Sequence, residues 1–137
     1  MAEEKRFEGK VKRFLHSVGI YAAGTPKQDM INEQHGWYLK HWGGGMSKSG
    51  IPDLIMCVNG IFMAPELKAP DGKPSDLQKK NISMINQGNG IGMILYPEGF
   101  EQFKNIVKGA LNCNFHIQDL EALKAVNSSS KCIILKE

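Results

Sequence analysis

The stretch DLIMCVNGIFMAPELK, from Asp53 to Lys68, decides the fold of this chain. It contains two apolar runs, Asp53 to Val58 and Ile61 to Lys68, separated by the dipeptide Asn59-Gly60. Asn-Gly between apolar runs is a strong hairpin signal, because a type I′ turn requires positive φ at both central residues. The stretch therefore predicts two antiparallel strands joined by a two-residue loop.

The two-residue loop also predicts which side chains face each other. Counting outward from the loop brings Asp53 directly opposite Glu66. Lys68 lies two residues beyond Glu66 and on the same face, because side chains alternate along a strand. Pro65 has no N–H and is typical of an edge strand or a bulge. A bulge there would move Glu66 off Asp53 by one position and turn it to the other face.

Opposed carboxylates are unfavourable on a sheet, and at about 5 Å they repel by roughly 1 kcal/mol in water and by more when partly buried. A divalent cation turns that repulsion into a binding site, since Mg²⁺ and Mn²⁺ prefer carboxylate oxygens. Such an ion can activate a water and neutralise phosphate charge, while Lys68 orients the water or stabilises the transition state. Glu-x-Lys alone is usually the solvated end of a strand; the register with Asp53 is what favours a site.

Periodicity on both sides of the hairpin predicts the remaining elements. Phe7, Val11 and Leu15 recur at helical spacing, and Gly19 follows as a C′ glycine would. The expected helices are 3–18, 75 or 76–87, 98–111 and a short one at 118–126, and the expected strands are 37–42, 53–58, 61–68 and 91–96. The order α-β-β-β-α-β, followed by another helix, predicts a mixed α/β sheet flanked by helices on both faces.

Composition restricts the function classes only loosely. A chain of 137 residues suits one domain, and 42% hydrophobic with 23% charged residues is typical of a soluble globular protein. The net charge of +3 permits contact with a polyanion without requiring it. Three cysteines without CxxC spacing argue against a disulfide framework and a zinc finger, and we expect Cys57 to be a small buried hydrophobe. With no membrane-spanning run and no signal-peptide pattern, we expect a cytoplasmic protein with no membrane partner.

The hairpin and its surroundings resemble a known nuclease pattern. The matching segments are Gly50-Ile51-Pro52-Asp53-Leu54, Pro65-Glu66-Leu67-Lys68-Ala69-Pro70, Gly72-Lys73-Pro74 and Leu77-Gln78. They resemble the PD-(D/E)xK superfamily and, more closely, its virus-type replication-repair nuclease (VRR-NUC) domain. The likeness extends from about Glu4 to Lys108 and implies a restriction-endonuclease-like core.

The resemblance implies a role for each residue of the motif. Asp53 and Glu66 would ligate Mg²⁺ or Mn²⁺, together with the backbone carbonyl of Leu67. Lys68 would be the catalytic lysine, and Gln78, in the helix after the hairpin, would support the site.

The family pattern also includes an acidic residue on the first helix, and two residues compete for that role. Glu8 borders the apolar stripe beside Leu15, so it can reach the sheet, and its distance from Gly19 fits the pattern better. Glu4 lies on the same side one turn earlier. Either could instead be a first-turn carboxylate favoured by the helix dipole.

Several basic and polar residues around the motif are candidates for contact with DNA phosphates. Lys48 and Ser49 belong to the glycine-rich segment 43–50, which either approaches phosphate closely or is an ordinary flexible loop. The other candidates are Lys73, Lys79 and Lys80, although lysines near a helix start are usually only solvated.

These observations predict a nuclease domain at residues 1–110 and a C-terminal extension at 111–137 that could form a dimer. We expect a metal-dependent endonuclease that hydrolyses DNA. The resemblance further implies a phage-type Holliday-junction resolvase of recombination and repair, acting as a homodimer on four-way DNA. The alternatives are a flap or other structure-specific nuclease, a restriction-type enzyme, a non-catalytic DNA-binding module, or a structural protein with an incidental Glu-x-Lys.

Overall fold

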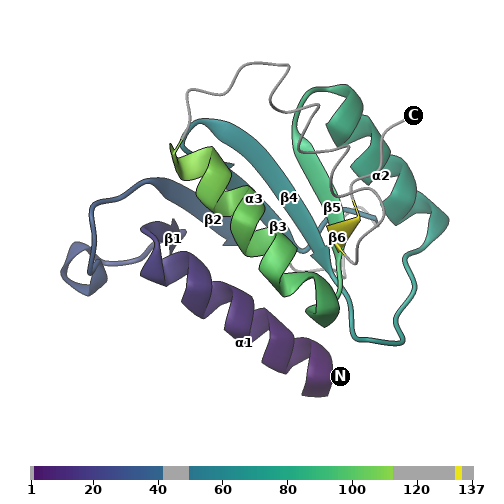
Figure 1. The fold of residues 1–137 in the computed structure, drawn as a ribbon, viewed down its shortest axis with the longest axis horizontal. Helices are drawn as coiled ribbons and strands as arrows, with labels where there is room; N and C mark the ends of the chain where they lie inside the picture. Colours follow the sequence, from purple (N-terminus) through teal and green to yellow (C-terminus); the bar gives the residue numbers. More distant parts are fainter. Residues whose placement is uncertain (1, 42–49, 113–131, 134–137) are drawn as a thin grey trace.

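The fold is that of a computed structural model, which describes residues 2–41, 50–112 and 132–133. Three expectations lie wholly or largely outside these residues: the phosphate contacts of Lys48 and Ser49, the short helix at 118–126, and the C-terminal extension at 111–137. Within them, the chain forms an open, mixed α/β sheet flanked by helices, as the sequence predicts (Figure 1).

The sheet follows the order of the chain, β1-β2-β3-β4-β5-β6. Pairs β1–β2 and β4–β5 are parallel, and the other neighbouring strands are antiparallel. The strands are β1 (Ile20–Ala22), β2 (Gly36–Lys40), β3 (Leu54–Val58), β4 (Ile61–Leu67), β5 (Ile91–Leu95) and β6 (Cys132–Ile133). The α-helices are α1 (Ala2–Ser17), α2 (Asp76–Gln87) and α3 (Phe100–Asn112), and the short 3-10 helices are η1 (Lys27–Asp29) and η2 (Pro97–Gly99).

The central hairpin has the expected turn and register. Asn59 and Gly60 have φ values of 50° and 83°, as a type I′ turn requires. The ladder pairs Val58 with Ile61 and continues outward in the expected register as far as Met56 and Met63. The β4 strand continues past Pro65, which pairs with β5 in the parallel ladder. The proline therefore does not turn Glu66 to the wrong face.

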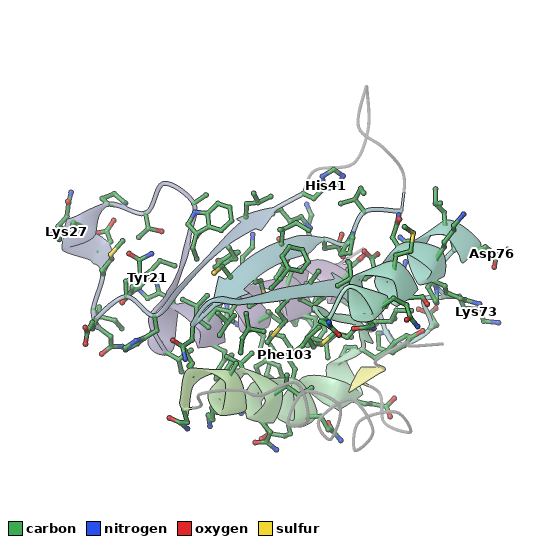
Figure 2. The ribbon with its side chains drawn as sticks, turned by 90° about the horizontal axis from the view of Figure 1, so that it is seen from above. Tyr21, Lys27, His41, Lys73, Asp76 and Phe103 are labelled. Carbon is green, nitrogen blue, oxygen red and sulfur yellow. The ribbon has the colours of Figure 1, made fainter. Side chains whose placement is uncertain are left out.

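One face of the sheet packs against α1 and α3, which lie side by side across it (Figure 1). Phe14 of α1 makes edge-to-face contacts with Phe100 and Phe103 of α3, with ring centroids 6.0 and 6.2 Å apart. Phe103 is fully buried between α3 and the sheet (Figure 2). The apolar stripe of α1 contributes Val11 and Leu15 to this core, as the helical spacing predicts.

The opposite face is only partly covered, because α2 packs mainly on β4 and β5. Ile82 of α2 is buried with Ile94 of β5. Farther across the same face, Trp37, Cys57 and Phe62 are cross-strand neighbours and all three are exposed. The expectation that Cys57 is buried is therefore wrong: the alternating strand turns it to the part of the sheet beyond α2.

Strand β1 is absent from the sequence-based expectation. With three residues it is too short to give a periodic pattern, and it lies parallel to β2 directly after α1. Ile20 and Tyr21 are buried there. Within the described part of the chain, no helix has the length and apolar character needed to cross a membrane.

The pairing of Asn86 with strand β5 gives a test of this architecture. Asn86 is fully buried. Its side-chain amide accepts from the Gly92 N–H (2.8 Å) and donates to the Gly92 carbonyl (3.0 Å), so it pairs with the backbone of β5 as a neighbouring strand would. We expect Asn86→Ala to lower the free energy of unfolding by about 2–4 kcal/mol, because both backbone groups lose their partner in the interior. Lys80→Ala, at an exposed position of the same helix, should change it by less than about 0.5 kcal/mol in urea titrations. Equal midpoints for the two variants would contradict this role of Asn86.

Candidate active site

Asp53 and Glu66 meet at the end of the central hairpin. The Asp53 N–H donates to Glu66 Oε1 (3.1 Å), and the Leu67 N–H donates to Asp53 Oδ2 (2.9 Å). Asp53 precedes β3, so the two acids are joined by these side-chain to backbone bonds rather than by a pair of the ladder. The two acids are therefore neighbours, as the sequence predicts, but the direct ladder pair between them is not formed, because the β3–β4 pairing ends at Met56 and Met63.

Glu66 is the most unusual group of the site, because it is a carboxylate that is only 3% exposed. Its Oε2 accepts from Gln78 Nε2 (2.9 Å) and lies 3.5 Å from Lys68 Nζ. Burial, together with the negative charge of Asp53, raises the pKa of Glu66 to about 7, although Lys68 and the Asp53 N–H act in the opposite direction.

Gln78 reaches Glu66 because of the way α2 begins. Ser75 is the N-cap, with its Oγ accepting from the Gln78 N–H (3.1 Å), while Gln78 Oε1 accepts from the Ser75 N–H (2.8 Å). This capping box holds the Gln78 amide by its oxygen. The amide nitrogen is thereby directed at Glu66.

Glu8 approaches the site from α1 and is linked to Asp53 through a lysine. Lys40 Nζ lies 2.6 Å from Glu8 Oε1 and 3.9 Å from Asp53 Oδ1. Lys12 Nζ lies 2.8 Å from Glu8 Oε2. Partial burial acts to raise the pKa of Glu8, but the hydrogen bonds and charges of Lys12 and Lys40 outweigh it, so the pKa is lowered. Burial raises the pKa of Tyr38, and the negative charge of Glu8 adds to this effect.

The structure distinguishes between the two acidic candidates on α1, and it leaves the roles of the remaining expected residues as predictions. Glu8, and not Glu4, makes the contact with Lys40 that leads to Asp53. The Leu67 side chain is buried in the core, and its carbonyl as a metal ligand stays a prediction. Three lysines lie exposed on the segment leading into α2 and on its first turns, and their contact with DNA also stays a prediction: Lys73, Lys79 and Lys80.

Sequence reasoning missed Lys40. The signal was present in the alternation of β2: Tyr38 is an inward-facing residue of the core, so Lys40, two positions on, points to the same side. A lysine at an inward-facing position is costly unless paired with a carboxylate. His41 follows, and its N–H donates to the Asp53 carbonyl (2.7 Å), which fixes the approach of the chain to the site.

The donor set suits a hard divalent cation, since it consists of carboxylate oxygens from α1 and the hairpin. However, no three acidic, histidine or cysteine side chains among residues 2–41, 50–112 and 132–133 are grouped closely enough to hold a metal ion as they stand. Asp53 Oδ1 faces Lys40, whose ammonium lies between that oxygen and Glu8. The carboxylate oxygens thus have the chemistry that Mg²⁺ or Mn²⁺ prefers, but the ammonium of Lys40 already lies between Glu8 and Asp53.

Comparison with known proteins does not identify this arrangement: no family model matches the chain, and neither curated proteins nor solved structures give a significant match.

The raised pKa of Glu66 predicts a pH dependence of stability in EDTA. Between the ordinary value of 4.5 and about 7, the native protein retains a proton that the unfolded chain releases, so stability falls as pH rises through this window. We expect a loss of about 3 kcal/mol from this group between pH 5 and pH 8.

Urea titrations of wild type and Glu66→Gln over that pH range measure the effect as a difference. The stability of the wild type relative to Glu66→Gln should decrease with pH, while Glu33→Gln, at an exposed position, controls for the loss of one charge. A constant difference between wild type and Glu66→Gln would show that Glu66 keeps an ordinary pKa.

Proposed function

We propose that this protein is a metal-dependent endonuclease of the PD-(D/E)xK type, similar to the VRR-NUC domain, that hydrolyses DNA phosphodiester bonds. The observation that carries the proposal is the meeting of Asp53, Glu66 and Lys68 at one end of the hairpin. Burying Glu66 beside a second acid costs free energy, and a bound divalent cation would offset that cost. The contact of Gln78 with Glu66 adds a member of the family pattern from a separate element.

In this proposal Asp53 and Glu66, with Glu8 from α1 and the Leu67 carbonyl, hold the cation. When bound, Mg²⁺ or Mn²⁺ supplies neutralisation of the phosphate charge and lowers the pKa of a water. In the hydrolysis, a P–O bond to the water would form as the ester P–O bond breaks; the water would release a proton to solvent and the leaving oxygen would take one from solvent. Lys68 Nζ, held 3.5 Å from Glu66, orients the water or stabilises the charge that develops on the phosphate oxygens.

Gln78 supports this chemistry indirectly. Its amide N–H bond to Glu66 Oε2 keeps that carboxylate in place, and the capping box of α2 keeps the amide in place. Lys73, Lys79 and Lys80 are exposed on the segment before α2 and on its first turns, and they suit non-specific contacts to the DNA backbone. Branched DNA, and a four-way junction cut by a homodimer, is the substrate that the family resemblance favours.

Cleavage assays with labelled DNA test the proposal. We expect Mn²⁺-dependent cleavage of a four-way junction in preference to a 5′ flap or a linear duplex, and no cleavage in EDTA. Lys68→Met and Asp53→Asn should each reduce the rate by about 100-fold or more, because one removes transition-state stabilisation and the other a metal ligand. Lys27→Met is a matched loss of one positive charge, at the far end of the molecule from Lys73 (Figure 2), and should cut as wild type does.

The outcomes separate the candidate functions. Cleavage of all three DNAs at equal rates would keep the nuclease and reject the junction preference. Binding of DNA without cleavage, in Mg²⁺ and in Mn²⁺, would reject catalysis and leave a DNA-binding module. Equal rates for wild type and Lys68→Met would remove Lys68 from the mechanism.

A further inference from the structure

The side chain of Lys40 crosses from the sheet to α1 and places a positive charge between two acidic residues. Its Nζ is 2.6 Å from Glu8 Oε1 and 3.9 Å from Asp53 Oδ1, and the side chain is only 18% exposed. Asp53 Oδ2 is already bonded to the Leu67 N–H, so Oδ1 is the oxygen that remains on the side of Lys40. In a partly buried ion pair of this kind, removal of one partner leaves the other charge poorly compensated.

Among the described residues, acidic and lysine side chains around the site are equal in number. Three carboxylates and three ammonium groups are joined by the ion pairs of this region, and they are Glu8, Asp53, Glu66, Lys12, Lys40 and Lys68. Adding a divalent cation while Lys40 stays in place would bring like charges together. The carboxylates of Glu8 and Asp53 can share a cation with charge +2 only if the ammonium moves away.

Space for that movement exists beside the lysine. A cavity of about 270 Å³ is lined by Lys40 itself together with Lys12, Ala22, Ala23, Tyr38 and Leu39. The cavity opens next to the α1 side of the site, and it is large enough to accept the end of a lysine side chain. The stem of Lys40 is flexible, with four carbons, so the ammonium can turn into this cavity without a change in the backbone of β2.

We infer that Lys40 is the resident counter-ion of Glu8 and Asp53 in the metal-free protein, and that a divalent cation binds by displacing its ammonium. The inference rests on the proposed function, because it assigns Glu8 and Asp53 to the metal. Lys40 is thus a positioning residue: it keeps α1 and the hairpin aligned before metal arrives, and its charge sets how tightly the metal is held.

Calorimetric titration of the whole chain with Mn²⁺ tests the displacement. Lys40→Met keeps the length of the side chain and removes the competing charge, so we expect Mn²⁺ to bind about tenfold more tightly or more. Lys12→Met removes the same charge from the other oxygen of Glu8 but leaves the link to Asp53, and should change the affinity by less than about threefold. Unchanged or weaker binding by Lys40→Met would overturn the inference, and so would equal tightening by Lys12→Met.

Thermal melting in EDTA tests the counter-ion without any metal. Lys40→Met should lower the melting temperature by several degrees, and the loss should be clearly smaller in an Asp53→Asn background, where less negative charge needs a partner. Additive effects of the two substitutions would overturn the counter-ion role. If wild type and Asp53→Asn both fail to bind Mn²⁺ while this coupling is present, the proposed function fails and the counter-ion role of Lys40 stands.

Discussion

Two acidic side chains share the end of the central hairpin, and the contacts around them offset their repulsion. Asp53 and Glu66 each accept a backbone N–H from the opposite strand, and hydrogen bonds to a charged acceptor are stronger than neutral ones. Those two bonds join the start of β3 to the end of β4 where Pro65 offers no N–H to the ladder. The repulsion is therefore accommodated by the same bonds that close the sheet at this end.

Helices from both faces contribute to the site because of where their packing places them. In α1, Glu8 follows the buried Phe7 and lies at the border of the apolar stripe, so packing of that stripe brings its carboxylate to Lys40 at the end of β2. In α2, the capping box fixes Gln78 before the helix has completed one turn. The site therefore receives Glu8 from a side of α1 and Gln78 from the first turn of α2. Both are rigid features, and the proposed nuclease would need such rigidity to hold a metal and a phosphate in register.

The parts of the site that sequence could predict depend on local rules. The turn at Asn59-Gly60 sets the register of the hairpin, and the register brings Asp53 to Glu66 without knowledge of any other element. Lys40 depends on the pairing of β2 with β3 and on the position of α1, which are non-local, and the exposure of Cys57 depends on how far α2 covers the sheet. Alternation along β2 indicates only that Lys40 shares the inward face of Tyr38; neither its carboxylate partners nor the exposure of Cys57 follows from periodicity. The burial of Glu66 is also non-local, since it requires β5 on one side and α2 above it.

Charge balance connects these features to metal binding. Lys40 and Lys68 each face a carboxylate, so part of the negative charge of the metal-free site is already paired. Because burial and Asp53 raise the pKa of Glu66 to about 7, the same site readily holds a proton near neutral pH. A metal ion that uses Glu66 must therefore displace a proton, and one that uses Glu8 together with Asp53 must displace an ammonium group. Both competitors are small cations on the carboxylates that the proposal assigns to the metal, so the affinity of such a site would depend on what these carboxylates already hold as well as on their number.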